Sequence, residues 1–258
     1  MKHVTRRDFV KNAAVTGAGL AAFNILGAQS SNGVHTGKIK VGLIGCGGRG
    51  NGALSNFIEA AKMLGISVEV VAVADAFENS AKGVANRYQV HHSRAHHGFS
   101  AYKEVANSDA EVVLMATPPS FRPLHFEACV QAGKHCFIEK PVAVDPVGAR
   151  QVIATGELAR QKGLTVVAGT QRRHTKGYLE MIAKLQSGAI GEIVGGSVSW
   201  NMGILWMAER KPGMSNADFL AKNWLNFTEL SGDHIVEQHV HQLDVTNWVM
   251  GRMPKSFI

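Results

Sequence analysis

The sequence predicts an α/β protein, with a doubly wound parallel sheet in residues 38–170 and a second, incomplete α/β region in residues 171–258. Three observations support this fold class. Short β-rich runs alternate with helical segments of about 10 to 15 residues, a glycine-rich turn follows the first run, and the pattern changes after residue 170.

The composition fits this fold and argues against several other classes of protein. The chain has 258 residues, of which 45% are hydrophobic and 18% charged, which suits one to two domains of about 150 residues each. After residue 30 no apolar run reaches about 18 residues, so no membrane span is predicted in the mature protein. Residues 1–28 contribute +3 to the formal charge of +7, and the remaining +4 is unclustered, so nucleic-acid binding is not predicted.

Residues 1–30 have the features of an export signal. The charged start Thr5-Arg6-Arg7-Asp8-Phe9-Val10-Lys11 precedes an apolar run from Ala13 to Ala28 that is rich in Ala and Gly. The paired arginines resemble a twin-arginine signal, which predicts a periplasmic or otherwise exported protein that uses the twin-arginine export machinery. The alternative is a surface helix capped by Thr5, which the many glycines disfavour.

The first strand runs directly into a loop suited to a phosphate group. Ile39–Ile44 is the predicted strand, Gly45-Cys46-Gly47-Gly48-Arg49-Gly50 the loop, and Asn51–Leu64 the helix that follows. Gly45 permits the tight turn, Gly47 lets the backbone approach a pyrophosphate, and Gly50 permits close packing of helix on strand. The N–H groups at the helix start can then bind the anion. The alternative is a glycine-rich turn in some other α/β protein.

An acidic residue ends the second predicted strand, Val68–Ala74. Asp75 lies 25 residues after Gly50, close to the spacing of an acid that accepts hydrogen bonds from an adenosine ribose. Its carboxylate would repel a 2′-phosphate, so NAD is predicted over NADP. Arg49 could reverse this preference by pairing with that phosphate.

Three further strands end in polar residues that can converge on one ligand. The strand Glu111–Ala116 ends in Thr117-Pro118, His135–Ile138 in Glu139-Lys140-Pro141, and Leu164–Ala168 leads into Gln171-Arg172-Arg173. The helices predicted between these strands are Phe121–Ala132 and Asp145–Gln161. Ligands bind beyond the carboxyl ends of such strands. Lys140 precedes a proline, which restricts its backbone, although a solvated lysine in a surface turn is the alternative.

The second region combines aromatic and polar residues with a candidate acid–base helix. After a helix at Lys176–Gln186 and a strand at Gly191–Trp200, the stretch to Phe227 is rich in Trp and Asn and suits a sugar or polyol, or else an ordinary packed loop. A single helix is predicted from Ser231 to Met250 and ends at Gly251. Its spacing places Glu237, His241 and Asp244 on one face, where a neutral histidine can take a proton from an alcohol. His234 and His239 lie on other faces, so no metal site is predicted.

These motifs, in this order, resemble the Gfo/Idh/MocA oxidoreductase family from about residue 38 to the end. The resemblance implies an N-terminal Rossmann domain that binds NAD(P) and a C-terminal α/β domain with an open, mostly antiparallel sheet, acting on sugars or polyols. It assigns Lys140 as the active-site lysine, His241 as the general acid–base, and Glu237 to a position where the family often has Asp. The implied reaction is hydride transfer from a carbinol carbon to nicotinamide, with His241 accepting the hydroxyl proton and Lys140 binding that oxygen.

The predicted site falls into three groups of residues, with no metal ligand among them. The catalytic residues are Lys140, Glu237 and His241. The residues predicted to bind the cofactor, which is NAD with NADP as the alternative, are Gly45, Gly47, Gly48, Arg49, Gly50, Asp75, Thr117, Pro118, Glu139 and Lys140. The residues that contact the substrate are Arg173, Trp200, Trp206, Asn223, Trp224 and Asp244.

Three functions remain open at this stage. The first is an NAD(P)-dependent oxidoreductase acting on a CH–OH group, either a sugar or polyol dehydrogenase or a sugar–sugar oxidoreductase that cycles its cofactor between two sugars. The second is an NAD-dependent glycosidase that uses transient oxidation and elimination. The third is a non-catalytic nucleotide-binding sensor or scaffold. The family's second domain normally continues with more strands, so the chain is expected to be truncated at its C-terminus. A homo-oligomer is expected only if the second sheet is complete.

Overall fold

The computed structural model describes residues 37–203 and 205–256 of the chain. The predicted export signal, residues 1–30, lies outside these described residues. Among them, no helix is both long enough and apolar enough to cross a membrane.

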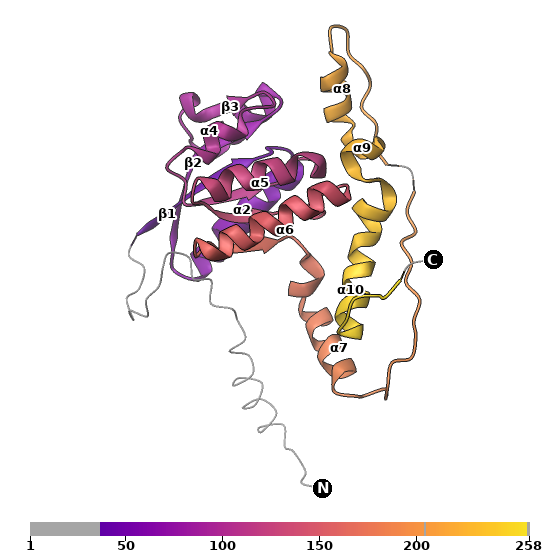
Figure 1. Ribbon diagram of the computed structural model, residues 1–258. Helices are drawn as coiled ribbons and strands as arrows, with labels where there is room; N and C mark the ends of the chain where they lie inside the picture. The colour runs from indigo at the N-terminus through magenta and orange to yellow at the C-terminus, as the bar shows by residue number, and fades with distance from the viewer. Residues whose placement is uncertain (1–36, 204, 257–258) are drawn as a thin grey trace. The chain divides into compact units, whose positions relative to one another are not determined.

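A six-stranded parallel sheet in the order β3-β2-β1-β4-β5-β6 forms the centre of the first region (Figure 1). Its strands are β1 (Lys38–Ile44), β2 (Ser67–Asp75), β3 (Ala95–His97), β4 (Val112–Met115), β5 (His135–Ile138) and β6 (Val166–Ala168). Ile44 at the end of β1 lies opposite Ala74 of β2 and Met115 of β4, so the strands end together. The predicted doubly wound parallel sheet is therefore confirmed, with β3 as a strand that the sequence analysis did not predict.

Helices cover the sheet and bury its apolar side chains. They are α2 (Gly48–Met63), α3 (Glu78–Tyr88), α4 (Tyr102–Ala106), α5 (Arg122–Gln131) and α6 (Pro146–Gln161), with short 3₁₀ turns at His92–Arg94 and Pro119–Phe121. Helix α5 packs on β4 and β5 and lies beside α6 (Figure 1). Its Phe126 and Cys129 join Val113 and Met115 of β4 in the core cluster, and each of these four residues is at most 1% exposed. This packing fixes the strand ends, because close-packed interiors deform little.

The second region is helical and irregular in the residues that the structure describes. After a 3₁₀ turn at Gln171–His174 come α7 (Lys176–Gln186), α8 (Asn216–Lys222), a 3₁₀ turn at Trp224–Asn226, α9 (Thr228–Ser231), a π-helical turn (Ile235–His239) and α10 (Val240–Met250). The strand predicted at Gly191–Trp200 is wrong, since that segment has no regular structure. A strand forms only where a neighbouring strand pairs with it, and no described segment does so here.

The single helix predicted from Ser231 to Met250 is confirmed only from Asp233 onward, since Ser231 belongs to α9. It is interrupted at Gly232 and Asp233, whose φ angles of 75° and 62° lie in the left-handed region. A π-helical turn follows and α10 continues from Val240, ending at Gly251 (φ 63°) as predicted. Single π turns inside helices frequently occur at functional sites.

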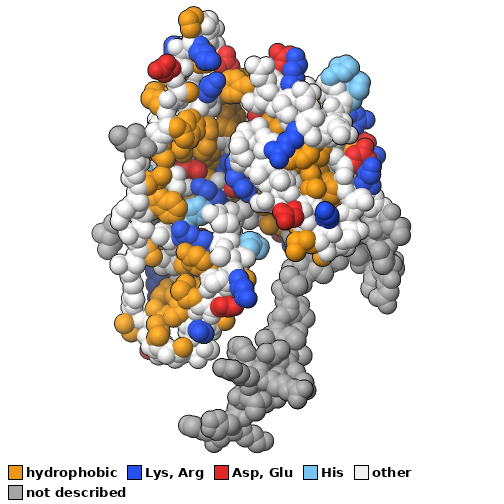
Figure 2. Space-filling model, turned by 180° about the vertical axis from the view of Figure 1, so that it is seen from behind, with side chains coloured by type: hydrophobic (Ala, Val, Ile, Leu, Met, Phe, Trp, Pro, Cys, Tyr) orange, Lys and Arg blue, Asp and Glu red, His pale blue; other side chains and the backbone are white. Residues whose placement is uncertain are grey.

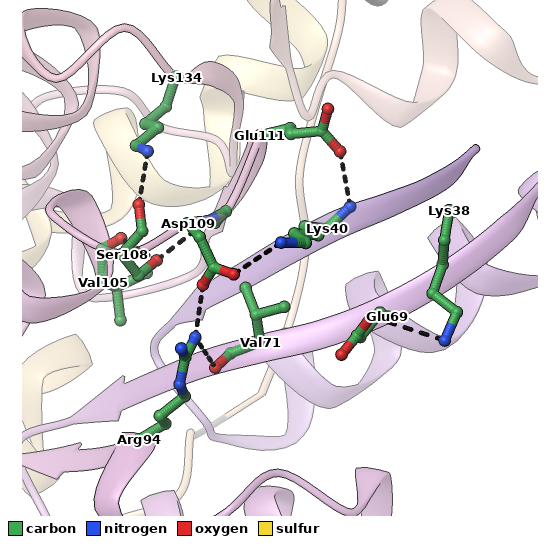
Figure 3. A network of polar contacts seen from close by, with 11 residues as sticks. Lys38, Lys40, Glu69, Val71, Arg94, Val105, Ser108, Asp109, Glu111 and Lys134 are labelled. Atoms are coloured by element: carbon green, nitrogen blue, oxygen red, sulfur yellow. Dashed lines mark hydrogen bonds and ion pairs between the residues drawn. The ribbon is translucent and has the colours of Figure 1, made fainter. Parts of the chain in front are cut away.

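A polar network lies at the amino-terminal ends of the strands (Figure 3). Asp109 accepts a hydrogen bond of 2.8 Å from Lys40 Nζ and another from Arg94. The backbone N–H of Lys40 donates to Glu111 at 2.9 Å. We call Lys40, Arg94, Asp109 and Glu111 the amino-end network; it joins β1 to the segments that precede β3 and β4.

Candidate functional site

The glycine-rich loop at the end of β1 needs glycine at two positions. Gly45 has φ +94°, and a Cβ there would lie 2.7 Å from the backbone N of Thr117. A Cβ on Gly50 would lie 1.8 Å from the carbonyl oxygen of Gly45. These contacts explain the tight turn and the close packing of α2, and they bring Gly45, Gly50 and Thr117 together.

The start of α2 is open to a ligand. Gly47 is its N-cap residue and provides no side-chain cap, so N–H groups of the first turn remain available to an anion. A Cβ at Gly47 or Gly48 would meet no atom within 4 Å, which leaves free space in front of the loop.

Asp75 connects the end of β2 to this loop. Its Oδ2 accepts a 2.7 Å hydrogen bond from the N–H of Cys46, and its Oδ1 accepts one of 2.9 Å from the N–H of Phe77. Burial raises the pKa of the Asp75 carboxyl, while the two N–H donors oppose this shift. Each carboxylate oxygen can accept a further bond, so a ribose hydroxyl can still be bound.

The loop and Asp75 open onto a cleft of about 1110 Å³. Its wall includes Gly45, Gly47, Gly48, Arg49, Asp75, Phe77, Tyr102, Thr117, Pro118, His125, Trp206, Lys211, Lys222 and Trp224. The free space at the start of α2, its available N–H groups and the acid at the end of β2 fit a dinucleotide. These described residues therefore suit the predicted NAD.

Glu139, at the end of β5, holds Arg49. Glu139 is 5% exposed, and its Oε1 accepts a 2.5 Å hydrogen bond from Arg49 Nε. The Arg49 side chain is nevertheless 54% exposed and lines the same cleft as Asp75. Its pairing with a 2′-phosphate therefore stays a prediction.

Lys140 forms the central contact of the site. Its Nζ donates to the Oε1 of Glu237 at 2.7 Å and to the Glu237 carbonyl at 2.5 Å. The Lys140 and Glu237 side chains are 15% and 10% exposed, and the Lys140–Pro141 peptide bond is cis. We call Lys140 and Glu237 the buried pair. The solvated lysine considered from sequence is thereby ruled out.

The second carboxylate oxygen of Glu237 lacks a hydrogen-bond partner among the described residues, although it is buried. Burial raises the pKa of Glu237, and the charge and hydrogen bond of Lys140 oppose this change without cancelling it. A buried oxygen with a free lone pair is available to a hydroxyl donor.

Arg122 is a buried charge that the sequence analysis missed. It is 4% exposed and its Nη1 donates to the carbonyl oxygen of Pro141 at 2.5 Å. Burial lowers its pKa to about 10, while the charges of Glu237 and Glu139 oppose this change. Its position in the sequence could have indicated a role in the site, because it begins α5 shortly after Thr117-Pro118 at the end of β4.

His241 lies near the buried pair and is 6% exposed. Its ring stacks on Trp200, with 5.4 Å between the ring centroids. Burial, followed by the positive charges of Lys140 and Arg172, lowers its pKa to about 4, and the charge of Asp244 opposes this change. His241 is therefore neutral at pH 7 and able to accept a proton.

Two predicted substrate residues pair with each other beside His241. Arg173 Nε donates to both carboxylate oxygens of Asp244, at 2.8 and 2.9 Å. The neighbouring Arg172, another residue that the sequence analysis did not single out, donates to Gln242 and lies 5.3 Å from the Trp200 ring. Three groups thus pack against α10 around His241: Trp200, Arg172, and Arg173 through its pair with Asp244.

The other predicted substrate residues lie elsewhere. Asn223 is fully buried, accepts from the N–H of Ala208 at 2.6 Å, and donates to the carbonyls of Ala208 and Phe219. The backbone thus engages its amide on both sides, and its role as a substrate ligand stays a prediction. Trp206 and Trp224 line the cleft with Asp75 rather than stacking on His241.

The described residues contain no group of three metal-ligating side chains close enough to hold an ion. The three cysteines, Cys46, Cys129 and Cys136, are free and buried.

Four features together indicate a dinucleotide-binding oxidoreductase: the parallel sheet, the glycine-rich loop, the acid after β2 and the lysine after β5. The family model GFO_IDH_MocA, described as an oxidoreductase family with an NAD-binding Rossmann fold, matches residues 39–170, about half of the chain. The chain belongs to this family.

The curated relatives share only about a quarter of their aligned residues with this chain. The chain is 26% identical to an inositol 2-dehydrogenase of Acidothermus cellulolyticus over 214 residues, which cover 82% of this chain and 53% of the relative. It is also 26% identical to glycosyl hydrolase family 109 protein 2 of Shewanella sp. (strain ANA-3) over 243 residues, 86% of this chain and 52% of the relative. The chain therefore spans about half the length of these relatives.

The fold is similar to that of solved structures. The WlbA dehydrogenase from Chromobacterium violaceum, crystallised in complex with NADH and UDP-GlcNAcA, aligns with a TM-score of 0.60 at 21% identity, over 83% of this chain and 55% of that one. At this identity the similarity concerns the fold alone.

Proposed function

We propose that the protein is an NAD(P)-dependent oxidoreductase that acts on a CH–OH group of a sugar or polyol. The observation that carries this proposal is the position of Lys140, which is buried against Glu237 and close enough to His241 to lower its pKa. The inositol 2-dehydrogenase relative supports the substrate class. The acid at Asp75 supports NAD as the preferred cofactor.

Each residue has a distinct role in the proposed reaction. The glycine-rich loop and Asp75 would hold NAD, which supplies the hydride acceptor when bound. Lys140 binds and polarises the substrate hydroxyl oxygen, and neutral His241 accepts the hydroxyl proton. The buried Glu237 carboxylate holds the Lys140 ammonium in place, and Trp200 fixes the imidazole plane.

Reduction of NAD at 340 nm with a panel of inositols, aldoses and alditols tests the proposal. We expect turnover with at least one of them, and loss of that turnover with retained NAD binding in Lys140→Ala and His241→Ala. Full turnover by either variant would remove that residue from the mechanism. NAD binding without turnover on any compound would favour the sensor or scaffold alternative.

The family 109 relative, which matches 86% of this chain, favours a second candidate, an NAD-dependent glycosidase. Both reactions begin when the hydroxyl group of a carbinol loses its proton and the carbinol carbon loses a hydride, so the same residues serve both. Glycosidase activity releases a sugar from a nitrophenyl glycoside with no net change in NADH. Equal formation of NADH and oxidised product would instead support the dehydrogenase.

We also propose that residues 1–30 are a twin-arginine signal and that the mature protein is exported. The paired Arg6 and Arg7 support this proposal. Expressed in its host, the protein should be found in the periplasm with a mature N-terminus near residue 28. Substituting both arginines by lysine should leave the full-length chain in the cytoplasm, and unchanged export would contradict the proposal.

A further inference from the structure

A hairpin-like segment of the second region lines the same cleft as the nucleotide loop. Residues 205–226, which we call the cleft hairpin, contain α8 and the 3₁₀ turn that follows it. Trp206, Lys211, Lys222 and Trp224 of this segment line the cleft opposite Asp75 and the glycines. Hydrophobic and basic side chains are exposed together over this region (Figure 2).

Internal hydrogen bonds hold the two limbs of the cleft hairpin together. The buried Asn223 side chain bonds both the N–H and the carbonyl of Ala208, at 2.6 and 3.2 Å. Asn226 Nδ2 donates to the carbonyl of Trp206 at 3.0 Å. These bonds place Trp206 and Trp224 at neighbouring points of the hairpin, so the two rings belong to a built surface rather than to an unstructured loop.

The cleft hairpin contacts the side of the sheet where Asp75 lies. Lys222 Nζ is 5.7 Å from the centre of the Phe77 ring, and the N–H of Phe77 donates to Asp75. Neither Lys140 nor His241 is among the residues that line this cleft. These lining residues of the hairpin therefore face Asp75, whereas Leu205, Leu225 and Asn226 line a separate pocket with Glu237.

We propose that the cleft hairpin forms the second wall of the site for the adenosine half of the cofactor, with Trp206 and Trp224 against the adenosine. This inference rests on the proposed nucleotide-binding function. Indole rings offer flat apolar faces on which a base stacks. The exposed ammonium groups of Lys211 and Lys222 add positive charge beside a diphosphate, while the α2 amides bind it from the other wall.

Tryptophan fluorescence tests this proposal, because the chain has four tryptophans in two places. Trp206 and Trp224 line the cleft, whereas Trp200 stacks on His241 and Trp248 lies 5.1 Å from Arg173. The test variant is Trp206→Ala/Trp224→Ala, which removes both aromatic faces, and the matched control is Trp200→Ala/Trp248→Ala. ADP-ribose should quench the control variant and leave the emission of the test variant unchanged. Its affinity for the test variant should fall by about 10-fold, equal to about 1.4 kcal/mol, because the indole faces on which the base would stack are removed.

The outcomes separate this inference from the proposed function. Equal ADP-ribose affinity for both variants, with a response from Trp200 or Trp248, would overturn it and leave the dehydrogenase proposal intact. A response from Trp206 and Trp224 without turnover on any polyol would support the second wall and contradict the dehydrogenase.

Limited trypsin digestion of the unaltered chain provides a second measurement that needs no folded variant. Arg210 and Lys222 are exposed residues of the cleft hairpin, and Lys62 is an exposed residue at the other end of α2 that serves as the reference. ADP-ribose should slow cleavage after Arg210 and Lys222 relative to Lys62, and nicotinamide mononucleotide should not. Unchanged cleavage at saturating ADP-ribose would overturn the proposal.

Discussion

Two clusters of charged residues lie at opposite ends of the same sheet, and they differ chiefly in burial. In the amino-end network, Lys40 and Asp109 pair at 2.8 Å with side chains 42% and 41% exposed. In the buried pair, Lys140 and Glu237 meet at 2.7 Å with side chains 15% and 10% exposed. The two ion pairs thus have nearly equal N–O distances, but one is exposed to water and the other is buried.

The carboxyl pKa values of the two clusters shift in opposite directions because of this difference in burial. Hydrogen bonds from Lys40 and Arg94 lower the pKa of Asp109 to about 2. Burial instead raises the pKa of Glu237, although a lysine is bound to it. Lowered and raised pKa values both occur in proteins, but raised carboxyl pKa values with a specific charge partner in a cleft are typical of functional sites. The comparison therefore favours the carboxyl ends of the strands as the site of chemistry.

The largest effect is expected from Lys140→Met, which breaks the buried pair. Turnover should be lost, and the free energy of unfolding should fall by about 3 kcal/mol, because the buried Glu237 carboxylate loses the ammonium group that is hydrogen-bonded to it. Urea unfolding at pH 7 measures the stability change, and a steady-state assay measures turnover.

The double variant Lys140→Met/Glu237→Gln is the control for this prediction. It should recover much of the lost stability because Glu237→Gln removes the carboxylate charge that loses its Lys140 partner, but it should recover no turnover. A double variant less stable than Lys140→Met would show that Glu237 is stabilised by groups other than Lys140.

The next effect concerns proton transfer by His241. Its pKa of about 4 predicts that kcat/KM rises as pH increases through about 4 and stays level to pH 7, because the neutral imidazole is the active form. His241→Asn should lower kcat by about 10²- to 10⁴-fold and remove this acid limb. Circular dichroism at each pH shows whether the protein remains folded. A limb centred near 6.5 in the folded enzyme would mean that burial does not depress this pKa.

Asp75→Ala is expected to have a smaller, more selective effect. Removing the charge should raise the NADP-to-NAD affinity ratio by about 10-fold, equal to about 1.4 kcal/mol. The N–H groups of Cys46 and Phe77 also lose their acceptor. Glu78→Ala is the matched control, since Glu78 lines the same cleft but pairs with Lys82. Equal ratios in the two variants, measured by calorimetry, would show that Asp75 does not distinguish the cofactors.

The first region was predictable because local signals and physical need coincide there. Gly45 and Gly50 are required by contacts that no side chain could tolerate, and the strands alternate with amphipathic helices. The short strand Ala95–His97 was missed because Ala-His-His has neither apolar alternation nor β-branched residues. Its pairing with β2 is a tertiary effect.

The second region was harder to predict for reasons that its residues make plain. Gly191–Trp200 alternates like a strand, but alternation does not supply a partner. Asn223 looks like a sugar ligand in sequence, yet its amide serves the backbone of Ala208. The contact between Lys140 and Glu237 joins residues 97 positions apart, and only the family resemblance indicated that both belong to one site.

The smallest effect is expected from Asp109→Asn, which breaks the amino-end network. Exposed ion pairs are worth about 0.2–1 kcal/mol, so stability at pH 7 should fall by no more than about 1 kcal/mol, and less in 1 M salt. Because the folded pKa of Asp109 lies below its ordinary value, any contribution should be present above pH 4 and lost as pH falls toward 2. Turnover should not change, since Asp109 is at the far end of the sheet from Lys140. Chemical unfolding of Asp109→Asn and Lys140→Met at two salt concentrations compares their losses of stability. If Asp109→Asn lost several kcal/mol and salt did not reduce this loss, exposure to solvent would not explain the difference between the two clusters.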